Sequence, residues 1–188
     1  MSKILHVVIE ADNVLWKEKG CSLKNAPCAA VVCEDIPGVL QEMKQSKKNL
    51  FIVTDRDTET ARKLAEDGGI LDCFEDVHGT AFQGEFIAWA DIFRRFRDNQ
   101  MIKNAHNINP SNTIMILSST RCIRVAHHLG FLVIGVMSDD AIPSELMDAG
   151  ANVVVPFPGS VSHAVIMVEN LRKNVVSSEP KAEKLQHA

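Results

Sequence analysis

The feature that most constrains the fold is a regular alternation of short apolar runs with longer amphipathic segments. The apolar runs lie at residues 4–9, 50–53, 113–117, 132–136 and 153–155. Runs of this length and composition are typical of strands that are buried on both faces. Because strands alternate with helices along the chain, we predict a three-layer α/β sandwich around a mainly parallel, Rossmann-like sheet with right-handed crossovers.

The segments between these runs have apolar residues at helical spacing. Asp57 is the expected N-cap of a helix that starts at Thr58, and Gly68 with Gly69 is its expected end. A further short strand is expected near Val77. The expected helices span residues 38–47, 58–68, 86–96, 121–129, 143–149 and 161–173.

The length of 188 residues fits one domain, which we place at residues 1–175, followed by a polar tail at 176–188 that we expect to be disordered. A net charge of −4 provides no broad basic field for nucleic acid or for an anionic membrane. No apolar run approaches the roughly 18 residues of a membrane span, and the N-terminus does not have the pattern of a secretory signal. Five cysteines without a framework spacing favour a reducing, cytoplasmic setting.

Polar side chains follow four of the expected strands. In open parallel sheets, ligand sites form at the carboxyl ends of the strands, near the point where the strand order reverses. We therefore expect a site there. The residues delivered to that edge are Glu10 and Asp12; Thr54, Asp55, Arg56 and Asp57; Ser118, Ser119, Thr120 and Arg121; and Ser138, Asp139 and Asp140.

Several of these segments carry a family resemblance that extends from Lys3 to about Lys173. The stretch EADNVL at 10–15 resembles the first motif of the haloacid dehalogenase (HAD)-like superfamily, Asp-x-Asp-x-Thr/Val-Leu, and Trp16 after it is similar to the small magnesium-dependent phosphatase branch. The stretch FIVT at 51–54 resembles the second motif, and IMIL followed by two serines at 114–119 occupies the place of the fourth. The resemblance implies a HAD-like sheet and no large cap domain.

The resemblance also implies a chemistry. In the superfamily, the first Asp attacks phosphorus and binds Mg²⁺, and the second protonates the leaving group. The Thr or Ser of the second motif holds a phosphate oxygen, a Lys offsets the charge that builds, and acids of the fourth motif complete the oxygen shell of the magnesium ion. By position, Glu10 and Asp12 take the catalytic and metal-binding places, and Thr54, Asp55 and Ser118 take the phosphate-binding places.

This chain departs from the motifs at most of these positions. Glu10 stands where the nucleophilic Asp is expected, and its extra methylene moves the attacking oxygen by about 1 Å, a misplacement that can cost roughly a hundredfold in rate. No Lys lies at 83–86, where the third motif is expected, and Ser118-Ser119-Thr120 replaces the acids of the fourth. Asp139 is a candidate for a relocated metal ligand, and the Arg121 guanidinium for a substitute of the metal's charge.

We therefore predict a HAD-like pseudoenzyme in which Mg²⁺ is absent or weakly bound. It would be a binding or regulatory module whose partner is a protein or a phosphorylated ligand, and not nucleic acid or a membrane; self-association is left open. The alternative is a Mg-dependent phosphohydrolase with a rearranged metal site that includes Asp139 or Asp140. A receiver-like signalling module is disfavoured, because no Lys follows the strand at 132–136. More ordinary interpretations also stand: strand-end or helix-capping acids, a turn hydroxyl at Thr54, and a solvated Arg121.

Overall fold

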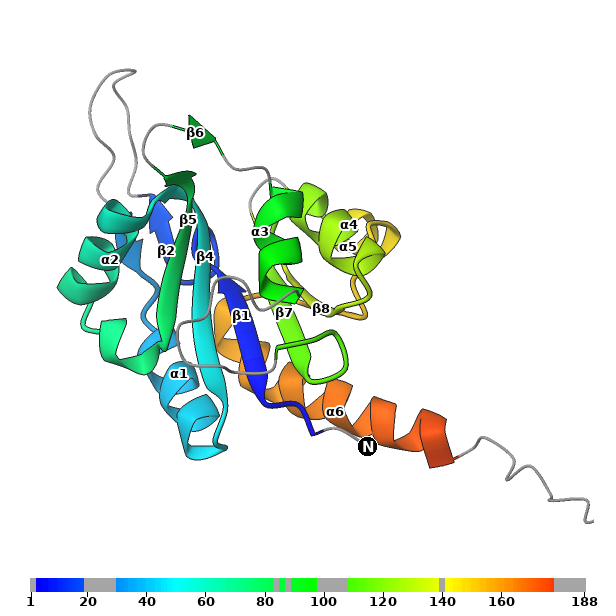
Figure 1. Cartoon of the computed structure of the whole chain (residues 1–188). Helices are drawn as coiled ribbons and strands as arrows, with labels where there is room; N and C mark the ends of the chain where they lie inside the picture. Colours follow the sequence, from blue (N-terminus) through cyan, green and yellow to red (C-terminus); the bar gives the residue numbers. More distant parts are fainter. Residues whose placement is uncertain are drawn as a thin grey trace, which may run out of the picture.

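The computed structural model describes residues 3–18, 30–82, 85–86, 89–97, 108–138 and 141–177. Its centre is a seven-stranded sheet in the order β6-β5-β4-β1-β7-β8-β9 (Figure 1). All neighbouring strands are parallel except the β5–β6 pair at one edge. The strands are β1 (His6–Glu10), β4 (Asn49–Asp57), β5 (Asp76–Phe82), β6 (Glu85–Phe86), β7 (Thr113–Leu117), β8 (Leu132–Val136) and β9 (Val153–Val155).

Helices cover both faces of this sheet, so the molecule has three layers, as the sequence predicts. One apolar core lies between the sheet and α1 (Ile36–Gln45), α2 (Thr58–Asp67) and α6 (Val161–Ser177). The other lies between the sheet and α3 (Trp89–Arg97), α4 (Thr120–His128) and α5 (Pro143–Asp148). Within β1, Val7 and Ile9 belong to the first core and Val8 to the second, because successive side chains of a strand point to opposite faces.

The strand order reverses at β1. The chain runs from β1 through β4 and β5 on one side of the sheet and then returns to β7, β8 and β9 on the other. The carboxyl ends of β1, β4 and β7 therefore meet at the switch point, where open α/β sheets bind their ligands. A separate antiparallel pair, β2 (Trp16–Glu18) and β3 (Ala30–Val32), follows β1 and was not predicted.

The predicted bounds agree with the structure at three strands: 113–117, 132–136 and 153–155. The prediction of a helix from Phe86 is wrong, because Phe86 pairs with Ala81 in the sheet and α3 begins at Trp89. The last helix continues to Ser177, and residues 178–188 lie outside the described residues. The absence of a large cap domain stays a prediction, because residues 19–29 and 98–107 also lie outside them.

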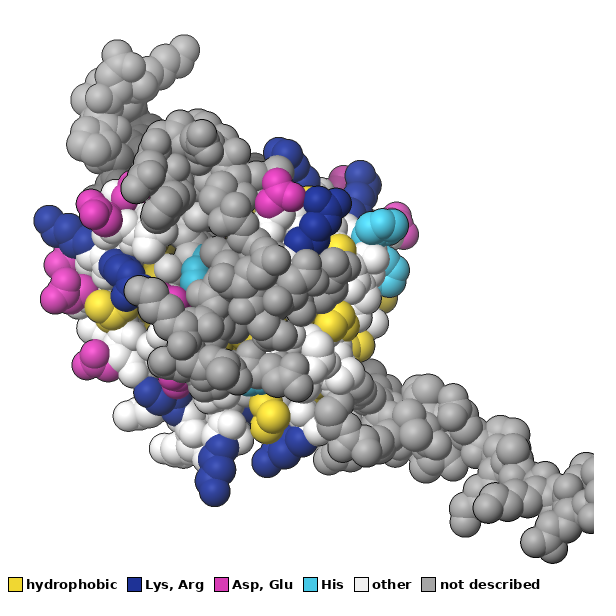
Figure 2. All heavy atoms as spheres, in the orientation of Figure 1, with side chains coloured by type: hydrophobic (Ala, Val, Ile, Leu, Met, Phe, Trp, Pro, Cys, Tyr) yellow, Lys and Arg dark blue, Asp and Glu magenta, His cyan; other side chains and the backbone are white. Residues whose placement is uncertain are grey.

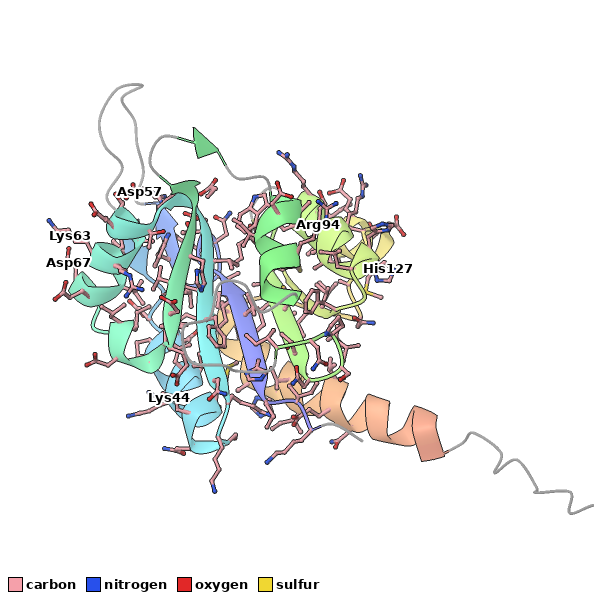
Figure 3. The ribbon with its side chains drawn as sticks, in the orientation of Figure 1. Lys44, Asp57, Lys63, Asp67, Arg94 and His127 are labelled. Atoms are coloured by element: carbon pink, nitrogen blue, oxygen red, sulfur yellow. The ribbon has the colours of Figure 1, made fainter. Side chains whose placement is uncertain are left out.

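Charged side chains of both signs are distributed over the surface that Figure 2 displays. On α2, Lys63 and Asp67 project outward, and Arg94 and His127 do so on the other side of the molecule (Figure 3). Asp57 marks the carboxyl end of the sheet and Lys44 the opposite end (Figure 3). Among the described helices, none is long and apolar enough to cross a membrane.

Candidate functional site

A tight turn after β1 presents the two acids of the first motif. The backbone N–H groups of Leu15 and Trp16 both donate to the Ala11 carbonyl, at 2.8 and 3.1 Å, and Asn13 within the turn adopts a left-handed conformation with φ of 64°. The Ala11 N–H donates to the Val53 carbonyl at 2.8 Å, which keeps the start of the turn attached to β4. Glu10 and Asp12 are thus fixed at the carboxyl edge of the sheet.

The Glu10 side chain extends across to the start of α4. Its Oε2 accepts hydrogen bonds from the backbone N–H groups of Ser118 at 2.6 Å and Ser119 at 3.2 Å, and from the Ser118 hydroxyl at 3.2 Å. Glu10 is only 5% exposed. Burial raises the pKa of Glu10 above its ordinary value, and the hydrogen bonds from Ser118 and Ser119 only partly oppose that increase. Glu10 therefore joins β1 to the junction of β7 and α4.

Cys122 contacts the second oxygen of the same carboxylate. Its Sγ lies 3.6 Å from Glu10 Oε1, and the residue is buried in the first turns of α4. Burial, reinforced by the neighbouring Glu10 charge, raises the pKa of the Cys122 thiol. The thiol is therefore neutral at physiological pH and acts as a weak donor to Glu10 rather than as a nucleophile.

Asp12 is held by three donors. Its Oδ2 accepts from the Thr54 hydroxyl at 2.7 Å, and its Oδ1 accepts from Arg56 Nε at 2.9 Å and from the Trp16 indole N–H at 3.0 Å. Partial burial would raise the pKa of Asp12, but these hydrogen bonds and the Arg56 charge together lower it below the ordinary value. Asp12 is therefore an ionised carboxylate in an internal ion pair.

Asp55, which follows Thr54 in β4, interacts with Asp12. Its partial burial, the nearby Asp12 charge and a hydrogen bond with the Asp12 side chain raise the pKa of Asp55. Asp55 was predicted to be a phosphate contact. That role stays a prediction.

The predicted convergence of Glu10, Asp12, Thr54 and Ser118 at one edge is present in the structure, although their catalytic, metal and phosphate roles stay predictions. The charge-substituting role of Arg121 also stays a prediction. Arg121 is exposed on the first turn of α4, and the guanidinium that bonds Asp12 belongs to Arg56. Arg56 reaches Asp12 because β4 continues to Asp57, well beyond the apolar run at 50–53.

Three contacts at this edge were not predicted from the sequence: those of Trp16 and Arg56 with Asp12, and that of Cys122 with Glu10. A signal for two of them was present. Arg56 lies two residues after Thr54, and residues at that spacing share one side of an extended strand. Trp16 lies four residues after Asp12 across a tight turn, a spacing that brings two side chains together within one helical turn. No spacing signal connects Cys122 with Glu10, since that contact depends on how α4 meets the sheet.

Within the described part of the chain, no group of three or more His, Cys, Asp or Glu side chains is placed to hold a metal ion. Asp139 and Asp140, the candidates for relocated ligands, lie outside the described residues. The Glu10 and Asp12 carboxylates at this edge already accept hydrogen bonds from protein groups, and the Ser118 hydroxyl shares its proton between Glu10 Oε2 and the Asp12 carbonyl oxygen, each at 3.2 Å.

No family model and no curated protein matches the sequence. Solved structures do match. A haloacid dehalogenase-like family hydrolase from Streptococcus pneumoniae is similar with a TM-score of 0.66 and 15% identity, over 86% of this chain and 98% of that chain. A predicted phosphatase from Clostridium acetobutylicum gives a TM-score of 0.63 and 21% identity, over 72% of this chain and 60% of that chain. L-2-haloacid dehalogenase from Xanthobacter autotrophicus gives a TM-score of 0.56 and 17% identity, over 73% of this chain and 62% of that chain.

These similarities define the class of fold. The chain has the fold of the HAD-like hydrolases and phosphatases, with β1 at its switch point, and the fold predicted from the sequence motifs is confirmed. At identities of 15–21%, the likeness extends to the fold and not to an activity.

Proposed function

We propose that this chain is a HAD-fold protein that has lost phosphatase chemistry and acts as a binding or regulatory module. The observation that supports this proposal best is the bonding of Glu10. Its carboxylate is buried and accepts hydrogen bonds from the start of α4, so it serves as an internal structural group.

A carboxylate nucleophile needs an ionised oxygen with a free approach to phosphorus. Glu10 Oε2 is bonded to Ser118 and Ser119, and Oε1 faces the Cys122 thiol. Burial also raises the pKa of Glu10, which lowers the fraction of the ionised, attacking form at a given pH. Both features oppose covalent phosphoryl transfer at this residue.

The residues that the structure describes at this edge do not fit a magnesium ion. Mg²⁺ requires near-octahedral coordination by oxygen and is usually bound through one or two carboxylates with water and substrate oxygens. Here the Glu10 oxygens are directed at α4, and Arg56 places a positive charge on the Asp12 carboxylate. A divalent cation at Asp12 would be repelled by the guanidinium and would have to replace its hydrogen bond.

The same charges favour a protein partner over a phosphorylated ligand. Asp12 and Asp55 lie together near the Thr54 hydroxyl, which already donates to Asp12. A phosphate group arriving there would meet two carboxylates and would compete with Asp12 for Thr54 and Arg56. We therefore expect the partner to be recognised by shape and by neutral or basic groups.

The test is a phosphatase assay on the full chain with p-nitrophenyl phosphate and Mg²⁺, Mn²⁺ or Co²⁺, beside the matched variant Asp12→Asn. We expect equal release of nitrophenol from the two proteins, at the level of the metal alone. Turnover by the wild type that Asp12→Asn abolishes would overturn the proposal and favour the alternative, a phosphohydrolase with a rearranged metal site. Electron paramagnetic resonance of Mn²⁺ titrated with the protein provides a second readout, in which a bound signal lost in Asp12→Asn would also contradict the proposal.

A further inference from the structure

A long uncharged stretch lies near the C-terminus. No Asp, Glu, Lys or Arg occurs at residues 149–168, whose sequence is AGANVVVPFPGSVSHAVIMV. At the chain average of 23% charged residues, a stretch of this length would carry about four or five. Its two ends are marked by Asp148 and Glu169. The stretch includes β9 and the first half of α6, so one region of the folded molecule lacks the charges that the rest of the surface carries.

This region is an edge of the central sheet. In the described residues, β9 pairs with β8 on one side and with no strand on its other side. Proteins that remain monomeric usually protect such edges with charged side chains, with proline inside the strand or with a bulge. β9 consists of three consecutive valines and contains none of these features, since Pro156 follows the last residue of the strand.

Each of the two helices that pack on β9 carries an exposed apolar side chain. Met147 on α5 is 50% exposed and Met167 on α6 is 54% exposed, and both helices pack on β9, from opposite faces of the sheet. On α6, Ile166 and Glu169 line a pocket against α1. Because residues advance by about 100° along a helix, Met167 projects from the side of α6 that faces away from α1, toward the β9 edge. Phe157, just after β9, is 52% exposed.

We propose that the β9 edge is the interface of a two-fold dimer, in which β9 pairs antiparallel with β9 of a second copy. Such a pairing would continue the sheet across the axis and place α5 beside α5 and α6 beside α6. Each half-exposed methionine would then meet its equivalent, as an isologous interface requires. This inference does not depend on the proposed loss of phosphatase chemistry.

A second copy fits this edge better than an extended peptide does. Three residues offer only a few backbone hydrogen bonds, which would hold a single foreign strand weakly. Met147 and Met167 lie in different layers, so that a strand in the plane of the sheet would leave both exposed. A partner that itself has three layers can cover both methionines, and another copy brings an equally uncharged β9 strand.

The test is sedimentation velocity of the full chain over a wide range of concentration. We expect a species of twice the 20.7 kDa chain mass that dissociates on dilution. The variant Met147→Lys/Met167→Lys should raise the dimer dissociation constant by about tenfold or more, since it buries unpaired charge against its equivalent. Ile166→Lys is the matched control: Ile166 is 56% exposed on the same helix but faces α1, so this variant should dimerise as the wild type does.

Hydrogen exchange gives a readout without mutation. The β9 amides should exchange more slowly at high than at low protein concentration, while the exchange of β5 amides should be independent of concentration. A wild type that stays monomeric throughout would overturn the proposal. So would a dimer that the double variant leaves intact, or one that Ile166→Lys disrupts equally.

Discussion

Glu10 accepts hydrogen bonds from two backbone N–H groups at the start of α4, so its removal should first affect stability. Glu10→Ala leaves both donors without their acceptor in a buried place, which we expect to lower the free energy of unfolding by about 2 kcal/mol. Glu10→Gln keeps a carbonyl oxygen there and should stay within about 1 kcal/mol of the wild type. Urea unfolding of the three proteins measures both effects. Equal losses in the two variants would contradict this account.

The pH dependence of stability provides a sharper test of the same residue. Burial raises the pKa of Glu10 in the folded state above its ordinary value of 4.5. Between the pKa of Glu10 in the unfolded chain and its higher pKa in the folded chain, the folded chain retains a proton that the unfolded chain has released. The free energy of unfolding therefore falls as pH rises through the folded pKa. The Glu10→Gln variant has no proton to lose at this position. Its free energy of unfolding should therefore increase relative to that of the wild type as pH rises above 4.5. Unfolding at a series of pH values would contradict the raised pKa if the two curves stayed parallel.

Arg56 and Arg121 offer a matched pair for the charge at the site. Arg56 bonds Asp12 and Arg121 is exposed on α4, so Arg56→Gln should raise the pKa of Asp12 and Arg121→Gln should leave it unchanged. Carbon-detected NMR titration of the Asp12 carboxyl group measures both. If the pKa of Asp12 rose in Arg121→Gln and not in Arg56→Gln, Arg121 and not Arg56 would supply the positive charge at this site.

At the scale of the elements, apolar runs determined the buried strands well. Residues 113–117, 132–136 and 153–155 are strands in prediction and structure alike, because a strand that is covered on both faces must be apolar throughout. Their order also places Glu10, Thr54 and Ser118 at one edge. What the sequence could not reveal is where a strand continues past its apolar run, since a polar extension resembles a loop. β4 is such a case, and Arg56 lies in its extension.

The extension of β4 depends on a close approach by β5. The register between the two strands shifts between Thr54 and Asp57, and a Cβ atom at Gly79 would lie 2.3 Å from the Arg56 carbonyl oxygen. Gly79→Ala must therefore displace backbone, and we expect a loss of about 1–3 kcal/mol in unfolding free energy. Gly38→Ala in α1 is the matched control, because a Cβ there meets no atom within 4 Å and should add about 0.5 kcal/mol. Comparable losses in both variants would show that the β4–β5 approach carries no special strain.

At the scale of the whole molecule, a partly buried ion pair connects segments near the two ends of the described chain. Lys48, just before β4, donates to the carbonyl of Ile4 at 2.9 Å and forms an ion pair with Glu169 on α6. The Lys48 side chain is only 4% exposed, so its charge has almost no contact with water. In its described part, the last helix is thus held by its apolar stripe and by the Lys48–Glu169 pair.

Breaking such a pair from one side is more harmful than removing it altogether, because a single deletion leaves an uncompensated buried charge. Glu169→Leu should lower the free energy of unfolding by about 3 kcal/mol, whereas Lys48→Met/Glu169→Leu should recover most of that loss through apolar contact with Met43 and Val165 in the same pocket. Urea unfolding of the wild type, both single variants and the double variant forms a complete cycle. If the losses of the single variants simply added in the double variant, α6 would be held without coupling between these charges, and the pair would have no role in joining the last helix to the sheet.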